Sequence, residues 1–108
     1  MNISNIAKMA QQMQTQMAQA QEELKETTLE ATAGGGAVRI VITGAQEVRS
    51  VEIDPSAIDP DEAEMLQDLV MTAINEAIAQ SKELERERMG GIAGAMGLPG
   101  MPGLPGFG

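Results

Sequence analysis

Apolar side chains between residues 3 and 26 recur at alternating steps of three and four positions. They are Ile3, Ile6, Ala10, Met13, Met17, Ala20 and Leu24. This spacing places them along one side of an α-helix, as in helices that pack against another helix. The segment contains no Gly or Pro, so we predict one long helix over residues 3–26. Because the seam is narrow and its side chains are small or flexible, this helix needs a partner elsewhere in the fold or in a second subunit.

From Thr27 the pattern changes to a period of two, which indicates β-strands. Three strands are predicted over residues 27–33, 38–43 and 47–53. Because the connections between them are short, neighbouring strands should pair antiparallel in a three-stranded meander. The glycine run at 34–36 is interpreted as a turn that needs positive φ. It is no phosphate-binding loop, since neither a helix start nor Gly-Lys-Ser/Thr follows it.

A second helix should begin at Asp59-Pro60-Asp61-Glu62, which offers an Asp N-cap, a Pro at the first helical position and a Glu able to close a capping box. A wide apolar stripe continues to about Arg88. Its members are Leu66, Leu69, Val70, Ala73, Ile74, Ala77, Ile78 and Leu84. We expect Gly90-Gly91 to end this helix. The acids around Asp59 lack the spacing of a Ca²⁺-binding loop, and helix capping explains them, so no metal or other cofactor is expected.

The chain therefore divides into an α-β-β-β-α domain over residues 1–88 and a flexible tail over residues 89–108. The tail has no charged residue, eight Gly and three Pro. The domain contains no aromatic side chain, so its core is thin, and its sheet has two unprotected edges. Pairing two copies corrects both defects. We therefore predict an α+β homodimer.

The amino-acid composition excludes several classes of function. The 108 residues include no Cys, His, Trp or Tyr, which excludes disulfides, Cys/His zinc sites and His-dependent nucleophile systems. Only carboxylates, Lys, Arg and hydroxyls remain for catalysis, so we do not expect an enzyme. The start of the chain lacks the features of a signal peptide, and no apolar stretch is long enough to span a membrane. A cytoplasmic protein without a membrane partner is expected.

The formal net charge is −9, but it is unevenly distributed. Residues 59–76 hold six acids and no base, whereas no acid precedes Glu22. If both helices lead away from the sheet, their outer ends carry Lys8 and the bases of residues 82–88. Only such neutral or slightly basic tips could approach a polyanion, because phosphate contacts depend on local Lys and Arg.

The bases of residues 82–88 also have a plainer interpretation. A solvated helix end would pair Glu83 with Arg86 and Glu85 with Arg88 at a spacing of three residues. On this interpretation the three bases 82, 86 and 88 carry no binding function.

Several motifs occur together in this chain. They are Ala33-Gly34-Gly35-Gly36-Ala37-Val38, Thr43-Gly44, Val48-Arg49-Ser50-Val51-Glu52-Ile53-Asp54-Pro55, the Gln/Met-rich segment 9–14, the helical segments 68–70 and 73–77, and the Gly/Leu/Pro tail. The combination resembles the YbaB/EbfC family of bacterial nucleoid-associated proteins. That resemblance implies a tweezer-like homodimer with projecting helical arms. It also implies binding of double-stranded DNA with little sequence preference, nucleoid organisation and effects on gene expression. The DNA-binding positions it implies are Lys8, Lys25, Lys82, Arg86 and Arg88.

The alternative hypothesis is a protein-binding adaptor for a DNA recombination or replication partner. The net charge of −9 favours it, because strong nonspecific DNA binders are usually basic. Met9, Met13 and Met17 could form an adaptable face for such a partner. Packing against another helix explains the same three residues.

Overall fold

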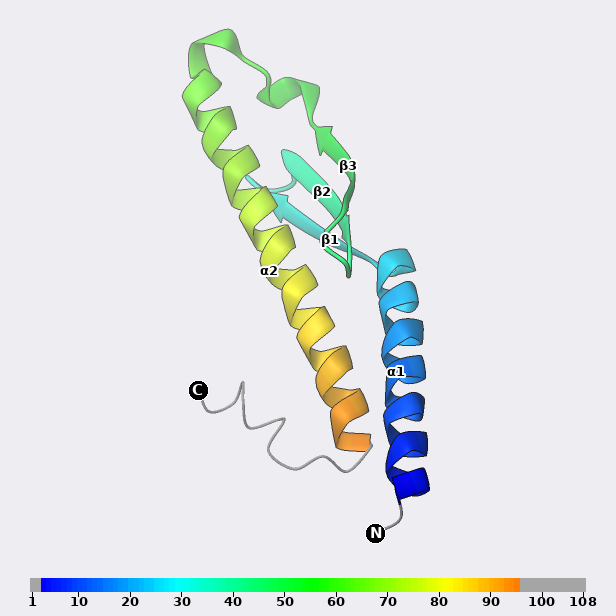
Figure 1. Ribbon diagram of the computed structural model, residues 1–108. Helices are drawn as coiled ribbons and strands as arrows, with labels where there is room; N and C mark the ends of the chain where they lie inside the picture. Colours follow the sequence, from blue (N-terminus) through cyan, green and yellow to red (C-terminus); the bar gives the residue numbers. More distant parts are fainter. Residues whose placement is uncertain (1–2, 96–108) are drawn as a thin grey trace.

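The computed structural model describes residues 3–95 and contains two helices, three strands and two short 3-10 turns. In chain order they are α1 (Ile3–Glu26), β1 (Thr28–Ala33), β2 (Val38–Thr43), β3 (Val48–Ile53), η1 (Pro55–Ala57), η2 (Pro60–Glu62) and α2 (Ala63–Ala95). The sheet is antiparallel in the order β1-β2-β3 (Figure 1). The predicted α+β fold, a three-stranded meander with two long helices, is confirmed.

The β1–β2 turn requires glycine for two reasons. Gly34, Gly35 and Gly36 have φ values of 65°, 68° and 96°, in the left-handed region where side chains are strained. In addition, a Cβ at Gly34 would lie 2.8 Å from Leu69 Cδ1 of α2. The turn thus packs its backbone directly against the helix.

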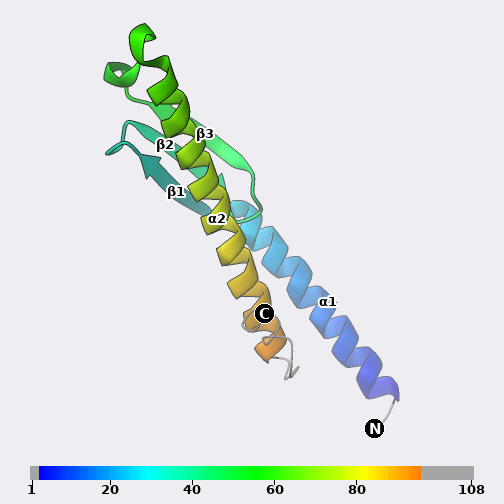
Figure 2. The same ribbon diagram turned by 90° about the vertical axis from the view of Figure 1, so that its left-hand side faces the viewer.

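The core lies between the sheet and α2, which covers one face of it (Figures 1 and 2). Val38, Ile40 and Ile42 of β2 are fully buried, and the small side chains of Ala73 and Ala77 let α2 approach them closely. Burial stabilises each of the larger side chains by about 1.5–3 kcal/mol. Apart from Leu84, every residue of the predicted apolar stripe belongs to this cluster or packs against it.

The second helix differs from the prediction at both ends. Asp59 caps a 3-10 turn, accepting the Asp61 backbone N–H at 3.0 Å, and the α-helix itself begins only at Ala63. Gly90-Gly91 does not stop the helix, which continues to Ala95. A helical Gly costs only about 1 kcal/mol relative to Ala, and the buried Ala93 beyond the pair favours continuation. The remainder of the predicted tail, 96–108, lies outside the described residues.

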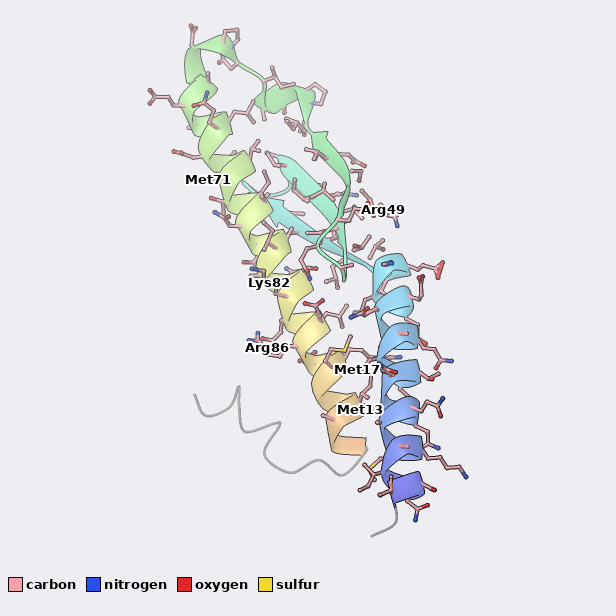
Figure 3. The ribbon with its side chains drawn as sticks, viewed as in Figure 1. Met13, Met17, Arg49, Met71, Lys82 and Arg86 are labelled. Carbon is pink, nitrogen blue, oxygen red and sulfur yellow. The ribbon has the colours of Figure 1, made fainter. Side chains whose placement is uncertain are left out.

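α1 and the last part of α2 leave the sheet in the same direction (Figures 1 and 2). We call residues 3–21 of α1 and residues 82–95 of α2 the arm. The seam of α1 faces α2: Leu24 is buried near the sheet, and Met13 and Met17 are half-buried on the side toward α2 (Figure 3). Toward its outer end the seam becomes exposed, reaching 81% at Ile3. The predicted packing partner of the first helix is thus present in the same chain.

A junction of backbone and side-chain contacts holds the base of the arm. The Gly44 N–H donates to Leu24 O at 2.9 Å, which joins the β2–β3 turn to α1. The buried Ser81 of α2 donates from Oγ to Thr43 O at 2.7 Å. It also accepts the Gln46 backbone N–H at 3.0 Å and Gln46 Nε2 at 2.9 Å. Both helices are therefore anchored to the same turn, which sets the direction of the arm.

Candidate functional site

Charge is divided between the arm and the rest of the molecule. The arm holds four basic residues and three acidic ones, a net charge of +1. Residues 22–81 hold three basic residues and thirteen acidic ones, a net charge of −10. Six of these acids lie between residues 59 and 76, in η2, the turn before it and the first half of α2, remote from the outer end of the arm (Figure 1). The arm is therefore the part of the chain least repelled by a polyanion.

The five predicted DNA-contact residues are exposed but do not form one cluster. Lys8 lies nine residues before Met17, which is two and a half helical turns, so it occupies the face of α1 opposite α2. Lys82 and Arg86 project from the side of α2 that is turned away from α1 (Figure 3). Lys25 lies at the sheet end of α1. The predicted residues thus line several faces of the arm and its base.

Two of the arm cations are held by carboxylates. Arg86 Nη2 lies 2.7 Å from Glu83 Oε1, which confirms the pair predicted from their spacing. The spacing had predicted that Arg88 pairs with Glu85. That prediction is wrong, because Arg88 pairs with Glu23 of α1. This contact joins α2 to α1 just outside the arm, because Glu23 lies between the arm and the sheet. No local signal in the sequence distinguishes Glu23 as the partner.

Lys8 and Lys82 have no carboxylate partner among residues 3–95. Lys25, by contrast, lies 3.6 Å from Glu22. Exposed ion pairs contribute only about 0–1 kcal/mol, so a phosphate can displace the carboxylate of such a pair at small cost. An unpaired Lys has no ion pair to give up when it binds a phosphate. Lys8 and Lys82 are therefore the cations most available to phosphate.

The surface around Lys8 consists of uncharged polar side chains, a feature to which the sequence patterns assigned no role. A surface hollow is lined by Lys8, Gln11, Gln12, Thr15 and Gln16. Thr15 Oγ1 donates to Gln11 O at 3.0 Å and so serves the helix backbone. The signal that could have drawn attention to this face is visible in the sequence, since no acid occurs before Glu22.

The acids near η1 and η2 act as caps. Asp54 Oδ1 accepts both the backbone N–H and the hydroxyl of Ser56, each at 2.9 Å. These hydrogen bonds lower the pKa of the Asp54 carboxyl, the one from the backbone N–H more than the one from the hydroxyl.

No group of three acidic side chains within residues 3–95 is positioned to hold a metal ion. Over the same residues, neither helix combines the length and the apolar character needed to cross a bilayer.

Comparison with known proteins identifies a family profile and several relatives that match this chain. The YbaB/EbfC DNA-binding family profile matches residues 1–96. A nucleoid-associated protein of Acetivibrio thermocellus is 48% identical over 95 residues, 88% of this chain and 84% of that protein. One of Chloroflexus aurantiacus is 48% identical over 96 residues, 89% of this chain and 96% of that protein.

A solved structure has the same architecture. The crystal structure of an uncharacterized protein from Helicobacter pylori matches with a TM-score of 0.72 at 25% identity, over 81% of this chain and 91% of that one. The match to the family profile spans both helices and the whole sheet. This chain therefore belongs to the YbaB/EbfC DNA-binding family of non-enzymatic nucleoid-associated proteins.

Proposed function

We propose that the chain binds double-stranded DNA as a homodimer with little sequence preference, in the cytoplasm at the nucleoid, where it organises DNA and influences gene expression. The observation that carries the proposal is the charge division, +1 on the arm against −10 elsewhere. DNA approaching the arm meets Lys8, Lys82 and Arg86 while the acidic part of α2 stays remote. Contacts of these side chains with phosphates carry no sequence information, which supports binding to many sequences.

The salt dependence of duplex binding tests this proposal. Lys8 and Lys82 of two protomers bring four unpaired cations, so log K should fall with log salt at a slope of about −4. We would titrate two unrelated duplexes by fluorescence anisotropy at several salt concentrations. Lys8→Gln/Lys82→Gln should make the slope clearly shallower than that of wild type and weaken both duplexes alike. The control Arg39→Gln, on the sheet beside Glu30, should leave the slope unchanged. No wild-type binding at low salt, or a wild-type slope near zero, refutes the proposal.

Uncovered apolar residues of β3 support the homodimer. Val51 pairs with Ile40 and Val48 with Ile42, and paired residues of antiparallel strands share a face of the sheet. Val48 and Val51 therefore lie on the face that carries the core, yet they are 45% and 50% exposed. The reason is that α2 packs mainly over β1 and β2 and leaves Val48 and Val51 of β3 uncovered, although Ile53 at the end of β3 still packs against the core.

A groove on α2 continues this apolar surface. It is lined by Leu66, Gln67, Val70, Met71, Ile74 and Asn75. The opposite flank of α2 lines a hollow together with Leu29 of β1, so the groove opens on the β3 side. A second copy is the occupant we propose. Each copy carries the same groove and the same unpaired β3 edge, so a two-fold pairing covers both at once.

Sedimentation equilibrium of Val51→Lys tests this interface. A buried, unpaired charge should convert the dimer to a monomer. Thr32→Lys is the matched control, because Thr32 is exposed on the other edge strand and should leave the dimer intact. A dimeric Val51→Lys protein contradicts the interface, and a monomeric wild type contradicts the homodimer.

The second candidate function is a protein-binding adaptor for a DNA recombination or replication partner. It is favoured by apolar side chains exposed at the outer end of α1, namely Ile3, Ile6 and Met9. Burying them in a partner would contribute about 25 cal/mol per Å². Ile3→Gln/Ile6→Gln should abolish binding of a purified partner and leave duplex affinity unchanged. Retained partner binding removes this candidate.

A further inference from the structure

The outer face of α1 offers a contact that does not depend on charge. We call Lys8, Gln11, Gln12, Thr15 and Gln16 the glutamine face. All five are exposed, and they line one surface hollow. Their helical spacing places them on neighbouring positions of one side of α1. Lys8 is the one charged residue between positions 3 and 21, in a chain whose net charge is −9.

The amides of this face are not engaged within the described part of the chain. Gln12 and Gln16 make no side-chain hydrogen bond to residues 3–95, and Gln11 contributes only its backbone oxygen, to Thr15. Glutamines elsewhere do have internal partners, since Gln46 Nε2 donates to Ser81. Each free amide presents two N–H donors and one acceptor to an approaching molecule.

We propose that the glutamine face contacts the phosphate backbone of duplex DNA through neutral N–H···O hydrogen bonds, with Lys8 as its single charge. This inference rests on the proposed function and specifies where α1 meets the duplex. Gln and Thr are regular donors to phosphate oxygens in protein–DNA complexes. The lack of acid from residue 3 to residue 21 lets a phosphate approach without repulsion. From Lys8 to Gln16 the helix rises about 12 Å, enough to pass several phosphates of one strand, which recur every 3.4 Å or so along the axis.

Neutral and ionic contacts respond differently to salt. Counterion release sets the slope of log K against log salt, and it depends on the number of charges neutralised. Removing a neutral amide leaves that slope unchanged and lowers affinity by the same factor at every salt concentration. A neutral hydrogen bond changes an equilibrium constant by about 2.3- to 13-fold. Losing two of them on an arm should therefore weaken binding at least about fivefold.

The test compares two double variants of the full chain on the same helix. Gln12→Ala/Gln16→Ala removes two amides of the glutamine face. Gln14→Ala/Gln21→Ala removes two exposed amides outside it. Ala is a better helix former than Gln, so α1 should persist in both, as far-UV circular dichroism can verify. Duplex binding is measured at several salt concentrations on two unrelated duplexes.

We expect the first variant to bind both duplexes at least about fivefold more weakly than wild type, with an unchanged slope, and the second to bind as wild type does. Equal affinity of the first variant and wild type overturns the inference while DNA binding stands, and so does an equal loss in both variants. A loss confined to one duplex indicates base reading and overturns the phosphate assignment. A wild-type chain that binds no duplex overturns both the inference and the proposed function.

Discussion

Replacing Gly44 with Ala tests how closely α1 is held against the sheet. A Cβ at Gly44 would lie 2.7 Å from Leu24 Cδ2 and 3.1 Å from Leu24 O. The Cδ2 atom belongs to a side chain that is only 3% exposed, so it has little room to move. The backbone oxygen is held by the Gly44 N–H at 2.9 Å, so it can retreat only if this hydrogen bond lengthens.

The size of the effect follows from these contacts. Overpacking of a well-packed site costs about 1–3 kcal/mol. Because one of the close contacts is to a backbone atom, we expect Gly44→Ala to lower the free energy of unfolding by about 2 kcal/mol. In a domain of this size each kcal/mol shifts Tm by roughly 4–8 °C. The variant should therefore melt roughly 8–16 °C below wild type.

Thermal and urea unfolding, followed by far-UV circular dichroism, measure this loss. Protomer concentration must be fixed, because association makes stability concentration-dependent. The urea midpoint should fall while the m-value stays constant. Gly91→Ala is the matched control: a Cβ there meets no atom within 4 Å within a helix, so this variant should melt at or slightly above the wild-type Tm. A Gly44→Ala protein as stable as wild type refutes the close approach of α1 to the β2–β3 turn.

Three further predictions concern Gly90, Ser81 and Asp54. Gly90→Ala should raise the free energy of unfolding by up to about 1 kcal/mol, because its Cβ meets open space in a helix; a lower Tm contradicts this. Ser81→Ala should cost about 1–3 kcal/mol in urea unfolding, because it removes the acceptor of the Gln46 N–H; no loss would mean that this hydrogen bond is dispensable. The hydrogen bonds from Ser56 lower the pKa of Asp54 in the folded chain, so their stabilisation is present above the unfolded pKa and is lost as pH falls through the folded one. Asp54→Asn should flatten the acid side of the stability–pH curve, and an unchanged curve argues against the cap.

Local patterns were sufficient to predict the elements and their order. The three-and-four spacing of α1, the period of two in the strands and the glycines at 34–36 located each element within one residue, up to the end of β3. These signals work because they express the geometry of a single helix, strand or turn. The predicted end of α2 was wrong. Gly90 and Gly91 destabilise the helix only slightly, so it continues to Ala95, where its residues still pack.

The partner of Arg88 was decided by the tertiary structure alone, whereas the Arg86–Glu83 pair follows from local spacing. Arg88 finds Glu23, 65 positions away, although Glu85 has the spacing of a local partner. In the same way Ser81 meets Gln46 only because α2 crosses the β2–β3 turn. Such contacts depend on where two elements lie relative to each other, which is set by the packing of the whole core and leaves no mark in the spacing of residues along the chain.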